Sequence, residues 1–244
     1  MTKRVAIVGA SGRMGQVAAR LIEAAKDLEL HATIAHGDDL DAMLGADVVL
    51  DFTLPQSSQT VVEHAVAAGI STVTGTSGWG KQRVASIGAL VAAKPGVGVL
   101  IVPNFSIGSV LASSFAAMAA KYFDSIEIVE AHHPAKVDSP SGTAVRTAEL
   151  IGEARAALGP VIAPHVDQRA RGQQVASVPI HSMRMQGVLA KQDVIFGGNG
   201  EVVTISHLTM SSSAYEAGIL LALRAVGDIE GVVVGLDSLL DLQS

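Results

Sequence analysis

The chain has 244 residues, of which 49% are hydrophobic and 16% are charged, so it carries enough apolar material for a sizeable α/β core and is not disordered throughout. Lys and Arg number 17 against 23 Asp and Glu, and the net charge of -6 argues against a nucleic-acid partner. Cysteine is absent, which excludes disulfides, thiolate metal sites and cysteine nucleophiles. Because no run approaches the ~20 apolar residues of a membrane helix, we expect a cytoplasmic protein without a membrane partner.

The first half alternates short aliphatic runs with helical patterns. The predicted strands are Val5–Val8, Leu28–Ile34, Val48–Phe52, Ile70–Thr74 and Val97–Val102. The predicted helices are Gln16–Lys26, Ser57–Ala68 and Gln82–Ala93. Unbroken apolar strands that alternate with helices are typical of a parallel sheet covered on both faces. We therefore predict an α/β, Rossmann-like, doubly wound parallel-sheet domain over residues 1–129.

The pattern changes after about Ala131. A polar segment precedes a predicted helix at Thr143–Leu158 and a loop at Gly159–Gln174. Strand-like runs follow at Val175–Met185, Asp193–Phe196 and Val202–His207, with a hairpin turn at Gly197–Gly200 and a last helix at Ser213–Val226. These elements predict a second domain of α+β class with a mixed open sheet over residues 130–215.

A glycine-rich turn follows the first strand and opens the first helix. Its residues are Gly9, Ala10, Ser11, Gly12, Arg13, Met14 and Gly15. Such a turn lets the backbone approach a pyrophosphate, whose charge then lies at the helix N-terminus. The acidic residue expected ~20 positions later to bind the adenosine ribose is absent, because Ala35 and His36 stand there. Asp38 from a shifted loop is one substitute, and acceptance of the NADP 2′-phosphate is the other, so NADH and NADPH both remain open.

Further strand ends carry residues suited to a ligand. Asp51-Phe52-Thr53 closes the third strand, and Gly75-Thr76-Ser77-Gly78 closes the fourth. Val102-Pro103-Asn104-Phe105 closes the fifth strand. Ligands of open α/β sheets lie beyond the carboxyl ends of the strands, so we expect these segments to line one edge with the glycine-rich turn.

The densest chemistry lies between Glu130 and Ala144. His132 and His133 are adjacent on an extended segment and point to opposite faces, so no metal site is predicted there. Histidine exchanges protons near neutral pH, and Lys136 supplies a cation or a proton nearby. Ser141 is placed to cap a helix whose N–H groups would face an anion such as a substrate carboxylate. The segment therefore favours hydride addition to a small, anionic, unsaturated substrate with a proton delivered beside it.

The order of these motifs resembles the 4-hydroxy-tetrahydrodipicolinate reductase family, also called dihydrodipicolinate reductase. The motifs are G-A-S-G-R-M-G, D-F-T, G-T-S-G, P-N-F-S-I-G, E-x-H-H-x-x-K-x-D-x-P-S-G-T-A and F-G-x-x-G-E, which run from Gly9 to about Gly218. The resemblance implies NAD(P)H-dependent reduction of 4-hydroxy-tetrahydrodipicolinate, a cyclic dicarboxylate imine precursor, to tetrahydrodipicolinate on the diaminopimelate route to lysine.

The resemblance also implies a role for each matching residue. His132 and Lys136 would be catalytic, and His133, Gly142 and Thr143 would hold substrate carboxylates. The cofactor would contact Gly9, Ala10, Ser11, Gly12, Arg13, Met14, Gly75, Thr76, Ser77, Val102, Pro103, Asn104 and Phe105. Residues 130–215 would bind substrate and build a homotetramer, and residues 216–244 would pack back on the dinucleotide-binding domain.

Three positions depart from the family pattern, and two other functions remain open. Ala35 replaces the acidic residue, Ser77 stands in the usual G-T-T-G, and Ser212 stands where the family often has arginine. One alternative is a reductase of another small keto or imino acid, which a substrate panel distinguishes. The other is a non-catalytic NAD(P)-sensing protein, whose ligand affinity would survive substitution of His132 or Lys136.

Overall fold

The computed structural model describes residues 2–240 and divides into two compact units. The first unit runs to Ser106 and resumes at Tyr215, and the second is Ile107–Ala214. The division therefore falls before Ile107 rather than at the predicted 129/130. The reason is that helix α4 (Ile107–Ala119) packs on helix α5 (Gly142–Ala154), and strand β6 (Ser125–His132) pairs within the second sheet.

The first unit is built on a six-stranded sheet whose neighbouring strands all run parallel, in the order β11-β5-β4-β3-β1-β2. Its strands are β1 (Lys3–Val8), β2 (Leu28–Ile34), β3 (Val48–Asp51), β4 (Ser71–Thr74), β5 (Gly98–Ile101) and β11 (Gly231–Val234). Strands β1, β3, β4 and β5 are almost wholly buried, as expected for strands covered on both faces. Their carboxyl ends consequently share one edge.

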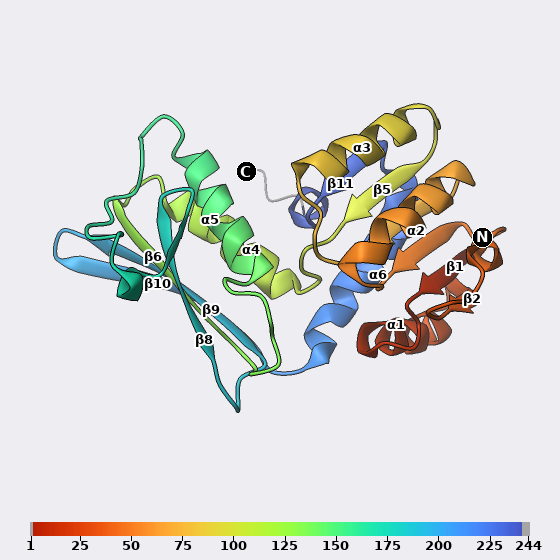
Figure 1. Ribbon diagram of the computed structural model, residues 1–244, viewed down its shortest axis with the longest axis horizontal. Helices are drawn as coiled ribbons and strands as arrows, with labels where there is room; N and C mark the ends of the chain where they lie inside the picture. The colour runs from red at the N-terminus through yellow and green to blue at the C-terminus, as the bar shows by residue number, and fades with distance from the viewer. Residues whose placement is uncertain (1, 241–244) are drawn as a thin grey trace. The chain divides into compact units, whose positions relative to one another are not determined.

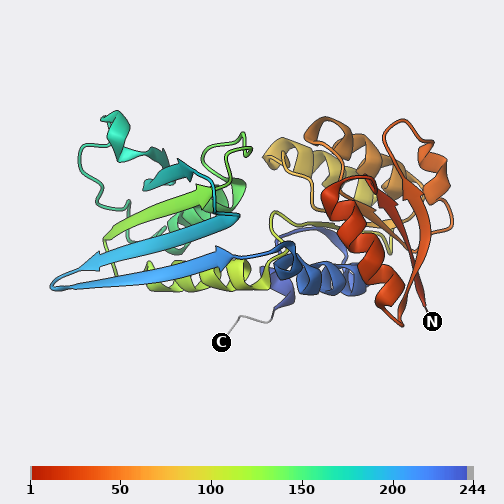
Figure 2. The ribbon, with the colours of Figure 1, turned by 90° about the horizontal axis from the view of Figure 1, so that it is seen from below.

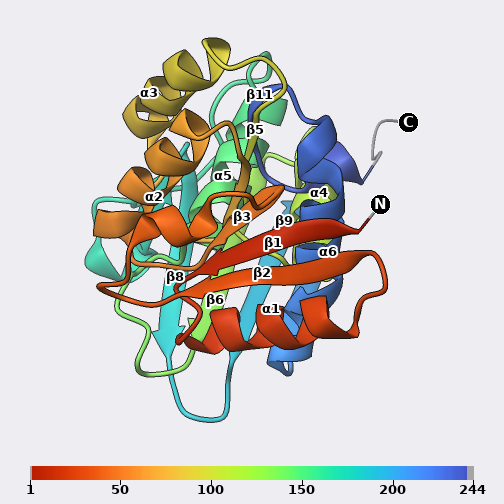
Figure 3. The same cartoon turned by 90° about the vertical axis from the view of Figure 1, so that its right-hand side faces the viewer.

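Helices cover both faces of this sheet. They are α1 (Arg13–Ala24), α2 (Pro55–Ala67), α3 (Lys81–Ala92) and α6 (Glu216–Ala225). Helices α1 and α6 pack together on one face, and α2 and α3 pack together on the other (Figures 1 and 3). This arrangement confirms the doubly wound, Rossmann-like fold predicted for the first half.

The C-terminal part of the first unit contributes α6 and β11, and β11 extends the sheet by pairing with β5. The predicted segment 216–244 ends in residues 241–244, which lie outside the described part of the chain. Short 3₁₀ helices occur at Leu40–Met43, Arg169–Arg171, Ser212–Tyr215, Val226–Asp228 and Asp237–Leu239. Among residues 2–240, no helix combines the length and the apolar character needed to cross a membrane.

The second unit contains a five-stranded mixed sheet in the order β10-β9-β6-β8-β7 (Figure 2). Its other strands are β7 (Gln173–Val175), β8 (Val178–Arg184), β9 (Ala190–Gly198) and β10 (Glu201–Thr209). Strands β6 and β8 are parallel, and the remaining pairs are antiparallel. The β9–β10 pairing confirms the predicted hairpin. The single run predicted at Val175–Met185 is instead two strands, because Ala176 and Ser177 adopt positive φ (47° and 69°) and form a turn.

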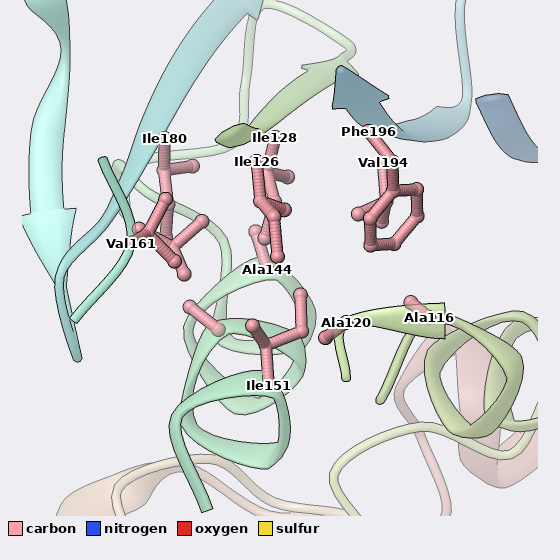
Figure 4. Close-up of a cluster of buried hydrophobic side chains, with 12 residues drawn as sticks. Ala116, Ala120, Ile126, Ile128, Ala144, Ile151, Val161, Ile180, Val194 and Phe196 are labelled. Carbon is pink, nitrogen blue, oxygen red and sulfur yellow. The ribbon is translucent and has the colours of Figure 1, made fainter. Parts of the chain in front are cut away.

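The core of the second unit lies between one face of this sheet and helices α4 and α5. Ile128 and Ile180 lie over Ala144 and Ile151 of α5, and Phe196 lies over the Ala116 side of the cluster, on α4 (Figure 4). Since alternate residues of a strand share a face, Glu130 and His132 continue the inward row of β6. The row thus turns polar next to the start of α5.

Candidate active site

Every predicted cofactor residue lies in the first unit, at the carboxyl edge of the parallel sheet. The glycine-rich turn leaves β1 after Val8, the turn beginning at Gly75 leaves β4, and the segment beginning at Val102 leaves β5. The structure therefore brings the three predicted segments to one sheet edge, as expected for a nucleotide site in an open α/β fold.

The three glycines of the first turn are required for different physical reasons. A Cβ on Gly9, where φ is +84°, would lie 2.5 Å from the Phe52 carbonyl oxygen. A Cβ on Gly15 would lie 2.4 Å from the Gly9 carbonyl oxygen, so α1 packs directly on the turn. Gly12 has ordinary backbone angles (φ -74°), and its Cβ would meet only the Gly9 oxygen, at 3.3 Å. Packing within the unit therefore explains Gly9 and Gly15, whereas Gly12 fits a position kept small for a ligand.

The beginning of α1 also fits an anionic group. Gly12 is the N-cap of α1, and the first turn of this helix has neither a capping side chain nor an acidic residue. No cap side chain or first-turn carboxylate therefore offsets the partial positive charge that the helix dipole places at this end. A phosphate is the kind of ligand that such an end binds.

The neighbouring turns are packed around Gly75. A Cβ there would lie 2.5 Å from both the Phe52 and Phe105 rings, whose centroids are 5.5 Å apart in an edge-to-face arrangement. Asp51, at the end of β3, is fully buried and accepts hydrogen bonds from the hydroxyls of Ser58 and Thr74. These contacts tie the ends of β3, β4 and α2 together and make the edge a preformed surface.

In the turn after β2, the carboxylate of Asp38 is bound by the backbone of position 35, where an acidic side chain was expected. Ala35 directly follows the strand, and its backbone N–H donates to Asp38 Oδ2 at 2.8 Å. Gly37, with φ +92°, lets the chain turn back so that Asp38 reaches this amide. Position 35 itself carries no charge, and one oxygen of the nearby carboxylate is engaged by the backbone.

The predicted catalytic and substrate residues all belong to the second unit. His132 ends β6, His133 begins the following turn, and the N–H of Lys136 donates to the His133 carbonyl at 3.1 Å. Gly142 and Thr143 are the first residues of α5. The structure thus brings all five to the region between the end of β6 and the beginning of α5.

A buried carboxylate organises this region. Glu130 has 0% exposed area, and its Oε2 lies 2.6 Å from His132 Nδ1. Arg184 donates to both carboxylate oxygens, at 2.9 and 3.0 Å, and the backbone N–H of Ser141 donates to Oε1 at 3.1 Å. A single carboxylate therefore contacts the histidine, the neighbouring strand β8 and the turn before α5.

The electrostatics of Glu130 follow from these contacts. Burial raises the pKa of this carboxyl, but hydrogen bonds from His132, Arg184 and Ser182 outweigh burial and lower the pKa to about 2. Glu130 is therefore ionised at neutral pH. Arg184 lies opposite His132 in the β6–β8 register, and it supplies the countercharge that a buried carboxylate requires.

Lys136 and the start of α5 provide the positive side of the site. Lys136 Nζ lies 2.7 Å from Asp138 Oδ1. Burial raises the pKa of Asp138, and the ion pair with Lys136 outweighs it, so that the pKa falls below its usual range. Ser141 is the N-cap of α5, as predicted, and its hydroxyl accepts the Ala144 N–H at 3.2 Å. The Gly142 backbone N–H also lowers the pKa of Asp138, so this carboxylate connects the Lys136 ammonium group to the first turn of α5.

Sequence reasoning did not assign a role to Glu130 or Arg184. The spacing of Glu130 and His132 contained a usable signal, because residues i and i+2 of a strand share a face. Arg184 lies 54 residues from its partner and gave no local signal. Within residues 2–240, no group of three or more His, Asp or Glu side chains is placed to hold a metal ion.

A Rossmann-like unit with a glycine-rich turn after its first strand, together with a second unit in which His132 contacts a buried glutamate, is typical of a two-domain oxidoreductase of the NAD(P)H-dependent class. Comparisons with known proteins narrow this class. Residues 3–105 match the dihydrodipicolinate reductase N-terminus, and residues 108–240 match its C-terminus. The chain belongs to the dihydrodipicolinate reductase family.

Individual relatives agree with this assignment. The 4-hydroxy-tetrahydrodipicolinate reductase of Clavibacter michiganensis subsp. michiganensis is 64% identical over 99% of this chain and 87% of its own length. The Streptomyces coelicolor reductase of the same name is 46% identical over 98% of both chains. The dipicolinate-bound dihydrodipicolinate reductase from Paenisporosarcina sp. TG-14 superposes with a TM-score of 0.82, at 31% identity over 98% of this chain and 99% of that one.

Proposed function

We propose that this chain reduces 4-hydroxy-tetrahydrodipicolinate to tetrahydrodipicolinate, in lysine and diaminopimelate biosynthesis, through the residues gathered between β6 and α5. The observation that carries the proposal is the acid–base pair of His132 and Glu130 beside Lys136 and a capped helix N-terminus. Substrate and product differ by a hydroxyl group, so the conversion takes up one hydride and one proton and releases water. NADH or NADPH supplies the hydride when bound.

In the first unit, the proposed cofactor residues are those of the sheet edge. The backbone from Gly9 to Met14 would hold the pyrophosphate at the start of α1, where no side chain caps the first turn. Gly75–Ser77 and Val102–Phe105 would line the neighbouring strand ends. The edge-to-face rings of Phe52 and Phe105 occupy the space that a side chain at position 75 would need, which keeps this turn close to the two rings.

In the second unit, His132 and Lys136 are the proposed proton-transfer groups. His132 Nδ1 is held by Glu130, so Nε2 is the ring nitrogen left to exchange a proton with the substrate. Lys136 Nζ offers three N–H donors and a positive charge, and it is held in an ion pair with Asp138 at 2.7 Å. Either group is suited to deliver the proton that accompanies reduction.

The substrate carboxylates are assigned to His133 and to the backbone of Gly142 and Thr143. The N-terminal turn of α5 favours negative charge through its aligned peptide dipoles. Lys136 adds a full positive charge close to this turn. Two negative carboxylates and a ring between them match this distribution of donors.

The proposal also covers the choice of cofactor, the assembly of the protein and its location in the cell. We propose that both NADH and NADPH are accepted, since position 35 carries no carboxylate to repel a 2′-phosphate. The outer face of the second sheet exposes Met183 (44%), Val202 (69%) and Leu208 (52%), and it supports assembly into a homotetramer. Membership of a biosynthetic reductase family supports a cytoplasmic location for this protein, and cell fractionation tests that location.

Matched variants test the residue roles. Lys191 pairs with Asp193 at 2.7 Å in the same i,i+2 spacing as Lys136 and Asp138, and His181 pairs with Glu127 at 2.7 Å. We expect Lys136→Met and His132→Gln each to lower kcat by about 10²- to 10⁴-fold. Lys191→Met and His181→Gln should stay within about threefold of the unchanged protein, since they lie outside the proposed site.

The measurement is oxidation of NADH or NADPH at 340 nm with freshly generated substrate, together with nucleotide affinity by fluorescence or calorimetry. Retained nucleotide affinity in the two site variants, with loss of turnover, supports the proposal. Equal losses in the site variants and their controls would contradict the assigned roles. Turnover with a different keto or imino acid alone would replace the proposed substrate.

A further inference from the structure

We propose that Glu130 is a positioning residue for this reduction, holding the His132 imidazole and the first turn of α5 in one arrangement through a single buried carboxylate. The inference rests on the proposed function, because it assigns Glu130 a role through the proton-transfer group named above. Glu130 has no exposed area, so it acts on bound substrate only through its partners.

The contact with His132 fixes which ring nitrogen faces the substrate. Glu130 Oε2 lies 2.6 Å from Nδ1, and an ionised carboxylate only accepts hydrogen bonds. Nδ1 therefore carries a proton in this arrangement. In the neutral ring, Nε2 then has the free lone pair, and in the charged ring it has the transferable proton.

The contact with Ser141 extends the same control to the anion-binding turn. Glu130 Oε1 accepts the Ser141 N–H at 3.1 Å, and the Ser141 hydroxyl in turn accepts the Ala144 N–H. Two successive hydrogen bonds thus connect the carboxylate to the first turn of α5. Any shift of Glu130 moves the proton-transfer group and the proposed carboxylate site together.

Arg184, on the adjacent strand β8, completes the set of hydrogen bonds around Glu130. It donates to both oxygens of Glu130, and its side chain is only 19% exposed. Planar guanidinium and carboxylate groups paired in this way restrict each other's orientation. A glutamine at position 130 has nearly the same shape, but its NH₂ group would face an N–H donor of Arg184 or of Ser141.

The chain contains its own control for this arrangement. Glu127, on the same strand, accepts hydrogen bonds from Arg171 and His181, which repeats the combination of one carboxylate with one arginine and one histidine. Glu127 and Glu130 are three positions apart, an odd offset, so the two side chains lie on opposite faces of β6. Glu127→Gln therefore removes a similar pairing without touching His132 or α5.

The first experiment compares steady-state kinetics of Glu130→Gln and Glu127→Gln in the full chain. We expect Glu130→Gln to lower kcat by about 100-fold or more, with the KM for NADH within about twofold, as when the partner of a proton-transferring histidine is replaced. Glu127→Gln should keep kcat within about threefold. Retention of kcat within about threefold by Glu130→Gln would overturn the inference.

A double-mutant cycle separates positioning from a structural effect. If Glu130 acts through His132, then adding Glu130→Gln to the His132→Asn protein should lower kcat by less than about twofold. A loss in kcat as large as in the unchanged background would mean that Glu130 does not act on turnover through His132, and would overturn the inference that one carboxylate positions His132 and the first turn of α5 together.

A measurement on the unchanged protein covers the case in which Glu130→Gln does not fold. Nitrogen-15 NMR of histidine-labelled protein reports which ring nitrogen carries the proton, with His132→Asn identifying the resonance. The inference requires a protonated Nδ1 in the neutral ring of His132, and protonation at Nε2 instead would overturn it. Failure of the unchanged protein to oxidise NADH or NADPH would contradict the proposed function. The NMR spectrum tests the Glu130–His132 contact separately, because it does not depend on turnover.

Discussion

Ala35 is the residue at which the chain departs from the acidic position that follows the second strand in dinucleotide-binding domains. Ala35→Asp restores a carboxylate there, and it should lower kcat/KM for NADPH at least about tenfold relative to NADH, because like charges repel the 2′-phosphate. Thr33→Asp, on the exposed side of β2, adds the same charge two residues earlier and serves as the control. An equal change for both cofactors in Ala35→Asp would contradict a role for position 35 in cofactor choice.

Glu130 makes stability depend on pH in a definite direction. Its pKa is about 2 in the folded protein against an ordinary 4.5, so it stabilises the fold fully above about pH 5. This contribution, about 3 kcal/mol for a shift of this size, is lost as the pH falls from 5 toward 2.

Denaturant unfolding at pH 6 and pH 2.5 measures this dependence. The unchanged protein should lose about 2.5 kcal/mol more stability between the two pH values than Glu130→Gln, in which nothing titrates at this position. Equal losses in the two proteins would show that the carboxylate is not held as described.

At the scale of one element, two substitutions in the turn between β1 and α1 distinguish a packing role from a ligand-binding role. Gly15→Ala places a Cβ 2.4 Å from the Gly9 oxygen and should cost about 1–3 kcal/mol in stability. Gly12→Ala meets only one atom at 3.3 Å, so it should leave the midpoint of thermal unfolding nearly unchanged while weakening NADH binding about tenfold or more. Unchanged NADH affinity in Gly12→Ala would remove this turn from the nucleotide site.

The elements also show what the sequence can and cannot predict. Aliphatic runs were sufficient to predict β1 to β5 of the first unit, because the central strands β1, β3, β4 and β5 are largely buried. Strand β11 was not predicted from the sequence. The division at Ile107 was missed, since α4 continues the aliphatic composition of the first half and only its packing on α5 assigns it to the second unit. The short strand β7 was missed because the turn at Ala176–Ser177 contains no glycine.

The candidate site shows the same limit. His132, Lys136 and the cap at Ser141 lie within one short segment, so their proximity was readable from spacing alone. Arg184 comes from another strand, and only the β6–β8 register brings it to Glu130. Long-range strand pairing is the information that local patterns lack.

At the scale of the whole molecule, the outer face of the second sheet predicts assembly. Val202 and Leu208 are large, exposed and on the face away from α4 and α5, and burial of such a face is favourable. Light scattering coupled to size exclusion should give the mass of four chains. Val202→Glu combined with Leu208→Glu should give smaller species with the same circular dichroism spectrum. A monomer in the unchanged protein would contradict the proposed tetramer.

The most direct test of the account is the rate of NADH and NADPH oxidation by the unchanged protein with freshly generated 4-hydroxy-tetrahydrodipicolinate. We predict rapid oxidation that depends on this substrate, with both cofactors active, because position 35 carries no carboxylate. Folded protein that binds nucleotide but oxidises neither cofactor with this substrate would contradict the central claim, that the residues between β6 and α5 catalyse its reduction.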